Sequence, residues 1–471
     1  MTDALFLFDP QVDDVPVNSD ELHAGWKLTL PAHIKRHAVQ AMRLKAGDSL
    51  QLSDGNGLRI QAVMADPEAG LAEVVEVGRE PEPLTRLALI QALAKTGHDE
   101  QAIDMATQIG VDQVVPWQAD RSIAKWKVGR TDKKWNSVLD AATEQSRRAF
   151  KPQLEACASS KEVVAICKKV EPDCVIQNAT AQTLYEVPLL LEREGLANVV
   201  CRKLELACGA PDLTAWGEMV ARIKTASRHV SIALVGKYTE LHDAYLSVEE
   251  SLFHAGTANN VIVDIRWVDS SKLTQENAEA VLGGCAGILV PGGFGDRGIE
   301  GMIVAAQYAR THKIPYFGIC LGMQIAVIEF ARHVLGWEDA HSAEFDEFTR
   351  HPVIDIMPEQ KSITQKGGTM RLGAYPCVLS EGSRAAALYG KTEISERHRH
   401  RYEFCNDFRD AFVAAGLVPT GLSPDGRLVE IVELPDHPWF TACQFHPEFK
   451  SRPDRPHPLF FGFVEAAASR I

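Results

Sequence analysis

A cysteine between two glycines is the residue in this sequence best placed to act as a nucleophile. It lies in Gly318-Ile-Cys-Leu-Gly322-Met-Gln324, where a strand pattern over 316–319 runs directly into a helical pattern over 321–334. A nucleophile on such a tight turn is held out of the sheet, and small flanking residues permit the turn. The helix N-terminus behind Cys320 favours the thiolate form. For this motif alone, a buried and inert cysteine is the alternative interpretation.

A histidine and a glutamate near the C-terminus could complete a catalytic triad. Thr441-Ala-Cys-Gln-Phe-His446-Pro-Glu448 predicts a strand followed by a short turn. Residues i and i+2 share a face where the backbone is extended, so we expect Glu448 to orient His446 and stabilise its imidazolium. The second ring nitrogen is then left for the thiol. An isolated His-x-Glu is more often a surface pair, but together with Cys320 it predicts a nucleophile, a base and an orienting carboxylate.

A glycine-rich loop supplies a candidate oxyanion hole. The stretch Val290-Pro-Gly-Gly-Phe-Gly-Asp-Arg-Gly-Ile-Glu300 follows a short apolar strand pattern. Glycine lets backbone N–H groups approach a ligand, so Gly293 is a candidate donor. A plain turn at the end of a strand is the alternative. The spacing is not G-x-G-x-x-G with a later ribose-binding acid, which disfavours a dinucleotide site.

The elements around these motifs predict an α/β multi-domain protein. Residues 229–471 show apolar strand patterns at 230–235, 261–267, 287–290 and 316–319, with helices between them, which predicts a central, mostly parallel sheet. Residues 1–80 predict a small β domain with a hairpin at 50–54 and 58–63. Residues 81–172 read as β-α-β-α, a partial parallel sheet with an exposed edge. Residues 173–228 form a helical connector.

Composition narrows the function further. The 471 residues carry 49 Lys+Arg and 63 Asp+Glu, a net charge of −14, which is unusual for a nucleic-acid binder. The exception is the segment 101–170, with 12 basic and 8 acidic side chains. Apolar runs fall short of the ~18 residues that a membrane span needs, and the N-terminus is unlike a signal peptide. The ten cysteines show no CxxC spacing, so we expect no metal site, no membrane association and a reduced, cytoplasmic chain.

Residues 175–471 resemble the connector and the class I glutamine amidotransferase domain of CTP synthases. The resemblance rests on long stretches of sequence, which are Gly236–Tyr238 with Asp243–Ser247, Val290–Met302, Ile314–Gln324, Met357–Gln360, Gly368–Gly373, Glu396–Glu403 and Ala442–Arg452.

The resemblance implies a role for each matching residue. Cys320 would form a thioester with glutamine, His446 would shuttle the proton, and Glu448 would orient it. The N–H groups of Gly293 and Leu321 would form the oxyanion hole. The substrate amino acid would be held by Gln324, Glu344 and Arg401, although a solvated basic run is the alternative for 397–401. Arg297, Gly298 and Glu300 match a lid linked to activation by GTP, and the glutaminase site itself would bind no cofactor.

Residues 1–170 resemble a different family, the bacterial small-subunit rRNA uridine-N3 methyltransferases. These proteins join a PUA-like β domain to a knotted SPOUT domain. The matching stretches are His37–Asp48, Ser53–Gly57, Gln91–Lys95, Ala106–Pro116, Arg121–Ser122 and Ala142–Arg148. The family's glycine-rich Gly-Pro-Glu-Gly-Gly loop, which binds S-adenosylmethionine, does not occur, so this half of the knot is missing. Arg121, Arg147 and Arg148 are the candidate RNA contacts.

Two functions follow as expectations. The first is a glutaminase that supplies ammonia for the amination of UTP to CTP. A P-loop-like phosphate motif is missing, so the ATP-dependent synthetase domain would act in trans. The second is an rRNA-binding or rRNA uridine-N3-methylating protein acting through residues 1–170, the one interpretation that would need S-adenosylmethionine.

Overall fold

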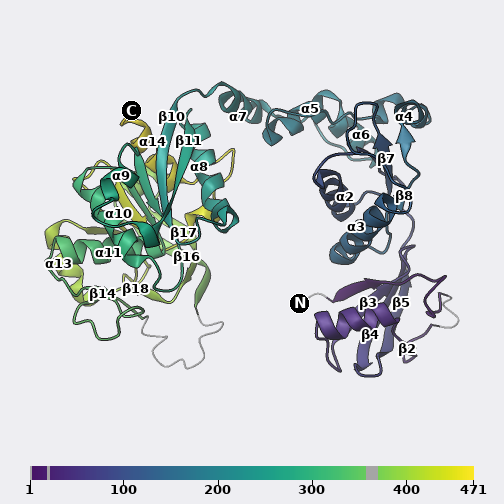
Figure 1. Cartoon of the computed structure of the whole chain (residues 1–471), viewed down its shortest axis with the longest axis horizontal. Helices are drawn as coiled ribbons and strands as arrows, with labels where there is room; N and C mark the ends of the chain where they lie inside the picture. Colours follow the sequence, from purple (N-terminus) through teal and green to yellow (C-terminus); the bar gives the residue numbers. More distant parts are fainter. Residues whose placement is uncertain (1–2, 18–21, 357–369) are drawn as a thin grey trace. The chain divides into compact units, whose positions relative to one another are not determined.

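The computed structural model describes residues 3–17, 22–356 and 370–471. The chain divides into two compact units, Met1–Pro211 and Asp212–Ile471. This division falls inside the predicted connector 173–228, so residues 173–211 group with the first unit and residues 212–228 with the second. Both units are drawn in Figure 1.

The first unit begins with a five-stranded sheet in the order β1-β3-β4-β5-β2. Its elements are β1 (Ala4–Leu7), β2 (Lys27–Thr29), α1 (Ala32–Arg36), η1 (His37–Ala41), β3 (Ser49–Ser53), β4 (Leu58–Asp66) and β5 (Leu71–Arg79). Buried and part-exposed residues alternate along most of β4, because one face of the strand packs on the core. The β3–β4 hairpin confirms the prediction from alternating residues.

A small parallel sheet follows in the same unit. Its elements are β6 (Ala88–Ala92), α2 (His98–Ile109), β7 (Gln113–Gln118), α3 (Thr131–Ser146), β8 (Gln153–Leu154), β9 (Ala158–Ser159) and α4 (Ser160–Cys167). Both β8 and β9 pair with β7, which enlarges the predicted β-α-β-α segment by two short strands. Among the described strands, β6 pairs with β7 alone, so it is an edge of this sheet. Four shorter elements then close the unit: η2 (Pro172–Cys174), η3 (Leu184–Glu186), α5 (Val187–Arg193) and α6 (Leu196–Lys203).

The hairpin turn of the first sheet docks on the chain that follows α3. Asn56 forms a β-bridge with Phe150, and the N–H of Gly57 donates to the carbonyl of Ala149 at 2.9 Å. Gly57 has a φ of +93°, and a Cβ there would lie 2.6 Å from the Phe150 ring. A glycine is therefore required at this turn for conformation and for space.

The second unit contains a nine-stranded sheet in the order β11-β10-β12-β13-β21-β20-β19-β16-β17. Its strands are β10 (His229–Gly236), β11 (Ile262–Asp269), β12 (Gly287–Val290), β13 (Tyr316–Ile319), β16 (Arg371–Leu379), β17 (Glu393–His400), β19 (Val418–Leu422), β20 (Val429–Glu433) and β21 (Phe440–Cys443). The five strands from β11 to β21 are parallel, and the other four join antiparallel. The sequence predicted the parallel half.

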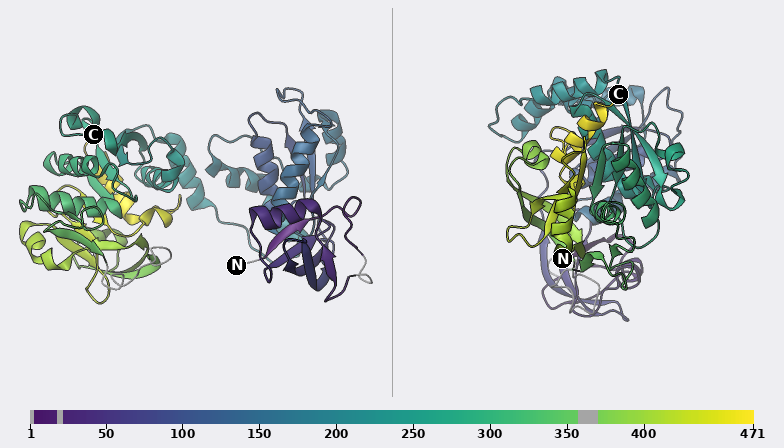
Figure 2. Two further views of the ribbon diagram at one scale, coloured as in Figure 1. Left: turned by 60° about the horizontal axis from the view of Figure 1, so that its bottom comes forward. Right: turned by 90° about the vertical axis from the view of Figure 1, so that its left-hand side faces the viewer.

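Helices cover both faces of this sheet, as the views in Figures 1 and 2 show. The described helices of the second unit, including short 3-10 turns, are α7 (Thr214–Thr225), η4 (His242–Tyr245), α8 (Leu246–Ala258), η5 (Ser270–Lys272), α9 (Ala278–Leu282), α10 (Ile299–Thr311), α11 (Leu321–His333), α12 (Arg384–Tyr389), η7 (Asn406–Phe408), α13 (Arg409–Ala415), η8 (Pro447–Phe449) and α14 (Pro458–Ala468). One core packs α10 and α11 on the sheet, and the other packs α8 and α14. Strands such as β12, buried on both faces, are therefore continuously apolar. A separate three-stranded sheet consists of β14 (His341–Ser342), β15 (Pro352–Ile356) and β18 (Tyr402–Phe404), which are interspersed in sequence with strands of the larger sheet.

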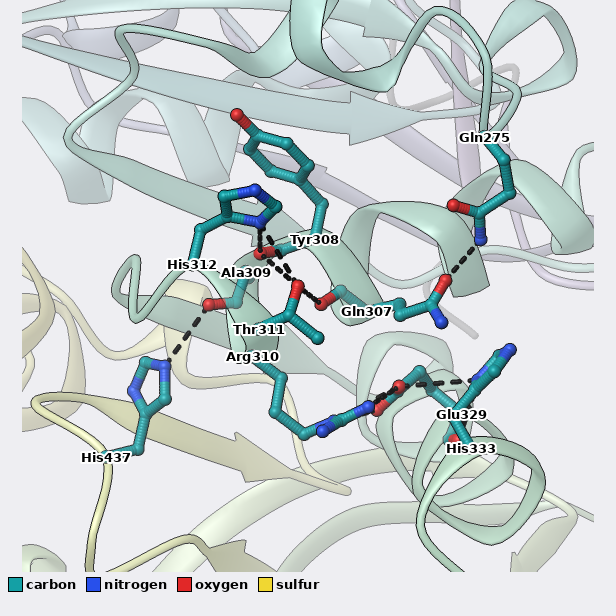
Figure 3. A network of polar contacts seen from close by, with 10 residues as sticks. All are labelled: Gln275, Gln307, Tyr308, Ala309, Arg310, Thr311, His312, Glu329, His333 and His437. Atoms are coloured by element: carbon teal, nitrogen blue, oxygen red, sulfur yellow. Dashed lines mark hydrogen bonds and ion pairs between the residues drawn. The ribbon is translucent and has the colours of Figure 1, made fainter. Parts of the chain in front are cut away.

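A polar network joins α10 to α11, the helix that begins after Cys320. Arg310 donates to both oxygens of the fully buried Glu329 carboxylate at 2.7–3.1 Å, and Figure 3 shows the two side chains pointing at one another. His437 lies 3.2 Å from the carbonyl of Ala309 through Nε2. The buried carboxylate of Glu329 is therefore paired, and the ion pair ties the C-terminal half of α11 to α10.

Candidate active site

Cys320 occupies a strained turn between β13 and α11. Its φ is +51° and its ψ is −99°, a backbone conformation that is rare for a residue with a Cβ. The N–H of Cys320 donates to the carbonyl of Cys443 at 2.7 Å, which ties the turn to β21. The strand-to-helix turn predicted from the glycine spacing is thus present, with the sulfur at its apex.

The two flanking glycines are required by space. A Cβ on Gly322 would lie 2.0 Å from the carbonyl oxygen of Val290, and a Cβ on Gly318 would lie 2.5 Å from the carbonyl oxygen of Gly322. Any larger residue at either position would push α11 away from β12 and β13. The glycines therefore allow the helix to begin directly against the sheet.

His446 and Glu448 form the predicted pair, although for a different local reason. Nδ1 of His446 lies 2.7 Å from Oε1 of Glu448. Strand β21 ends at Cys443, and His446 caps the short 3-10 helix η8 instead of continuing an extended strand. The expectation that i and i+2 share a strand face is corrected here: the tight turn of η8 brings Glu448 to the ring. The N–H of His446 donates to the carbonyl of Arg397 at 2.7 Å and fixes the backbone.

The surroundings of His446 favour its protonated form. Burial lowers the pKa of His446, but Cys320 and Glu448 beside it outweigh burial and raise the pKa to about 10. Its Nε2 is buried and has no hydrogen-bond partner among the described residues. A Cβ on Gly292 would lie 3.0 Å from Cε1 of His446 and 3.7 Å from Cβ of Cys320, so both side chains border the same glycine. This arrangement suits a thiolate–imidazolium pair.

The glycine-rich loop after β12 lies against the start of α11. A Cβ on Gly293 would be 3.3 Å from Cδ2 of Leu321, the first residue of that helix. The N–H of a first helical residue has no carbonyl to bond within its own helix. Lys237, which the sequence analysis did not select, donates from Nζ to the carbonyls of Phe294, at 3.2 Å, and Gly295. Burial lowers the pKa of Lys237 to about 8, partly offset by Glu344 and Asp296.

The structure gathers the predicted substrate-holding residues around Tyr402. Gln324 is 4% exposed and donates from Nε2 to the carbonyl of Tyr402 at 3.1 Å. Burial raises the pKa of Tyr402, with Glu344 adding to the rise and Arg401 opposing it. Glu344 is exposed and Arg401 is half-buried. Both charged groups therefore act on the side chain of Tyr402, whose backbone carbonyl binds Gln324.

The predicted lid residues lie at the start of α10. Gly298 caps the helix with a φ of +74°, and a Cβ there would meet Oγ of Ser270 at 2.2 Å. Arg297 donates to the carbonyl of Lys237. Glu300 is inside the first turn of the helix and pairs with Arg332 at 2.9 Å. Both charged side chains are thus engaged with the second unit itself.

The three predicted RNA contacts differ in their surroundings. Arg121 is exposed, and Arg147 is exposed and donates from Nε to the carbonyl of Asp3 at 2.7 Å. Arg148 donates to the carbonyls of Thr107 and Val111 and lies 3.4 Å from Asp112. Burial lowers the pKa of Arg148, partly offset by Asp112. Its guanidinium therefore binds groups of the first unit itself, which the basic segment of the sequence did not indicate.

A buried cluster on β17 and β20 has the residue types of a metal site. His398, His400 and Glu430 place one ligand atom each within 4.8 Å of one another. Nη1 of Arg371 lies 2.6 Å from Glu430 and 3.4 Å from Nδ1 of His398. Burial lowers the pKa of His398 to about 2 and of His400 to about 3, so both imidazoles are neutral. The guanidinium already balances the carboxylate and opposes a divalent cation.

Gln444 is a site residue that the sequence analysis missed. It is 1% exposed and lies 3.6 Å from Sγ of Cys320 through Nε2. The sequence did contain an indication of this role. Gln444 is a polar residue between the apolar Cys443 and Phe445, two residues before His446. Of the stretches that carried the resemblance, 357–360 and the start of 368–373 lie outside the described residues.

The comparisons with known proteins fall into the same segments. Residues 240–466 match the model of the class-I glutamine amidotransferase family, residues 80–200 the RNA methyltransferase domain, and residues 30–77 the RNA methyltransferase PUA domain. The fusion of these three kinds of segment, and the α/β multi-domain fold expected for it, are confirmed. Among the described residues, no helix is both long enough and apolar enough to cross a membrane.

Among the proteins similar to this chain are a CTP synthase and the glutaminase domain of another. The CTP synthase of Moorella thermoacetica is 58% identical over 326 residues, which cover 69% of this chain and 59% of that protein. The CTPS glutaminase domain of Trypanosoma brucei with bound acivicin is 44% identical, with 51% of this chain and 94% of that chain covered and a TM-score of 0.49. The chain spans about three fifths of the length of the CTP synthases it matches.

A solved methyltransferase is similar to part of this chain. The ribosomal RNA small subunit methyltransferase E of Neisseria gonorrhoeae, bound to S-adenosyl methionine, is 20% identical over 36% of this chain and 67% of that chain, with a TM-score of 0.30. The RNA methyltransferase match extends to residue 200, and a match of 326 residues must begin before residue 173. The two matches therefore overlap across the predicted boundary at 172/173.

Proposed function

We propose, on the premise that residues 240–466 form a class I glutamine amidotransferase domain, that this domain hydrolyses L-glutamine with Cys320, His446 and Glu448. The observation that supports this most is the backbone of Cys320, held at a φ of +51° beside a His446–Glu448 pair at 2.7 Å. Strain of this kind persists where the surrounding structure requires it, and it is typical of catalytic sites.

The chemistry follows from the order of these groups. The thiolate of Cys320 attacks the carboxamide carbon of glutamine, and the N–H groups of Gly293 and Leu321 stabilise the oxyanion that forms. The imidazolium of His446 gives its proton to the leaving nitrogen, which departs as ammonia and leaves a thioester. His446 then takes a proton from water, which attacks the thioester and releases glutamate. Glu448 holds the ring and its charge throughout.

The substrate's amino-acid end would be held by the residues around Tyr402. Arg401 offers a planar guanidinium that suits the α-carboxylate of glutamine. Glu344 would accept from the α-ammonium group, and Gln324, which bonds Gln444 beside Cys320, would also contact the substrate. We extend the proposal to activation by GTP through the loop of Arg297 and Gly298, with Glu300 held to Arg332 in this structure.

The destination of the ammonia is part of the same proposal. The relatives that match residues of this chain at 55–58% identity are CTP synthases. We propose that the domain supplies ammonia for the amination of UTP to CTP by a synthetase domain acting in trans. The segment that would bind ATP in such a domain has no counterpart motif within these 471 residues.

A glutamine-derived electrophile tests the proposal directly. We expect an electrophilic glutamine analogue to label Cys320 selectively among the ten cysteines, as read by mass spectrometry of the labelled peptides. Cys320→Ala should abolish glutamine hydrolysis and labelling while the protein unfolds at an unchanged temperature. Labelling chiefly at Cys443 or Cys285 would overturn the assignment of the nucleophile.

A second candidate function, contact with RNA, is favoured by the matches to the PUA and RNA methyltransferase domains. We propose that this chain does not bind S-adenosylmethionine. After β9 the described residues of the first unit continue into helices and add no further strand, so we derive no methyl transfer. We expect weak RNA binding that fades as salt rises. Arg121→Gln should weaken it in a filter-binding assay and Lys272→Gln in the second unit should not, whereas saturable S-adenosylmethionine binding by calorimetry would favour methylation instead.

A further inference from the structure

Gln444 makes a contact with the nucleophile that the triad does not include. Its backbone N–H donates to the carbonyl of Glu430 at 2.8 Å, which fixes the residue against β20. Its side chain then reaches Cys320, with Nε2 at 3.6 Å from Sγ. The side chain is 1% exposed, so bulk water does not compete for this contact.

Neighbouring groups determine which way the amide of Gln444 points. Nε2 of Gln324 donates to the carbonyl of Tyr402 at 3.1 Å and to Oε1 of Gln444 at 3.3 Å. A carbonyl accepts and cannot donate, so the Tyr402 carbonyl requires the NH₂ group of Gln324 at that position. The same NH₂ group requires the oxygen of Gln444 to face it. The NH₂ group of Gln444 is thereby directed at the sulfur.

A second contact to the sulfur has the opposite preference. The carbonyl oxygen of Arg399 lies 3.9 Å from Sγ of Cys320 and can accept the proton of the thiol. A carbonyl favours the protonated thiol, whereas an amide N–H favours the thiolate. The balance between Gln444 and Arg399 therefore bears on how much thiolate is present before glutamine binds.

We propose that Gln444 is a further catalytic residue, whose amide N–H stabilises the thiolate of Cys320. The proposal rests on the proposed glutaminase function for its biological meaning, but its physical content is a property of the resting protein. Through Oε1, the same amide joins the nucleophile to Gln324. The oxygen of Gln324 is then left to face the substrate, because its nitrogen is used twice.

The rate at which iodoacetamide alkylates Cys320 tests this without turnover. Thiolate is the reactive form, so the pH dependence of alkylation reports the thiolate fraction. Gln444→Glu keeps the size of the side chain and places a carboxylate at the sulfur. We expect the pH of half-maximal alkylation to rise by about one unit, which slows alkylation at pH 7 about tenfold. The Cys320 peptide is quantified by mass spectrometry.

Two further variants keep the result interpretable. Gln307→Glu makes the same substitution on α10, where Gln307 accepts from Gln275, and should alkylate as the wild type does. Gln444→Met removes the donor without adding charge and should give a smaller rise in the same direction. If circular dichroism shows that Gln444→Glu is unfolded, the proposal is tested by whether the pH of half-maximal alkylation rises in Gln444→Met.

The outcomes separate this proposal from the proposed function. An alkylation profile unchanged in folded Gln444→Glu and Gln444→Met would overturn the role of Gln444, even if the wild type hydrolyses glutamine. A raised profile in a protein that hydrolyses no glutamine would support the role of Gln444 and overturn the glutaminase proposal instead.

Discussion

His446 is bonded on one side to a carboxylate and borders a thiol on the other. Burial alone would lower its pKa, yet Cys320 and Glu448 raise the pKa to about 10. The proton-carrying ring is therefore the resting form over the physiological range. In this state the histidine can act first as an acid toward the leaving ammonia, and its basicity is needed only after the thioester has formed.

The substitution Glu448→Gln tests this electrostatic role. It removes one of the two groups that raise the pKa of His446, so the pKa falls. The basic limb of kcat/KM, where the imidazolium loses its proton, should move to lower pH, and kcat should fall about 10²–10⁴-fold. A pH–rate profile from about pH 6 to about pH 11 measures both. Glu465→Gln, at an exposed position on α14, is the control, and a basic limb that stays in place or moves upward in Glu448→Gln contradicts the role.

At the scale of elements, the loop after β12 and the first turn of α11 must converge on one oxygen atom. Gly293→Pro removes the N–H that the loop would donate, and Gly293→Ala keeps it. Loss of one oxyanion donor typically costs about 10²–10³ in turnover. We expect a loss of that size in the proline variant. The alanine variant should be close to wild type, because its Cβ needs a small shift of Leu321, 3.3 Å away.

The comparison is valid when both variants are folded and keep a reactive nucleophile. Thermal unfolding followed by circular dichroism checks the first condition, and iodoacetamide labelling of Cys320 checks the second. A folded proline variant with the activity of the alanine variant would exclude this N–H from the oxyanion hole.

The elements that the sequence predicted correctly are those with local patterns. The run into Cys320 is continuously apolar because β13 is buried on both faces, and the β3–β4 hairpin alternates because one face is exposed. The antiparallel strands β16, β17, β19 and β20 were not predicted. The pattern of β17 is not polar and apolar, because the strand ends in alternating arginine and histidine residues.

The site residues could be predicted where the residue type itself indicates a chemical role. They could not be predicted where the packing of the fold determines which groups a side chain contacts. Cys320, His446 and Glu448 were found by type and spacing, although η8 rather than a strand pairs the last two. Gln444 was missed because glutamine has no titratable group and its residue type does not by itself indicate a catalytic role. Arg148 was predicted to contact RNA because it lies in a basic segment. The sequence does not indicate that its guanidinium instead donates to two backbone carbonyls of the same unit.

At the scale of the whole molecule, a segment that matches the class-I glutamine amidotransferase family is joined to segments that match RNA methyltransferase domains. The described helices and strands of the first unit build a PUA-like sheet and a small parallel sheet. The sequence has no G-x-x-x-x-G-K-[ST] motif, the glycine-rich lysine loop of the P-loop type that binds the phosphates of ATP. Under the proposed function, a synthetase domain acting in trans would therefore use the ammonia released at Cys320.

The purified chain should accordingly make no CTP from UTP, ATP and glutamine. Glutamine hydrolysis should continue, since its groups all lie in the second unit, and ATP should not be consumed. Separation of the nucleotides by chromatography measures CTP and ADP, and a coupled glutamate assay measures hydrolysis. Replacing glutamine with ammonium chloride bypasses Cys320, and this mixture should also give no CTP. CTP formed with ammonium chloride would reveal a synthetase site in the chain. CTP formed with glutamine but not with ammonium chloride would show that such a site receives ammonia directly from the nucleophile.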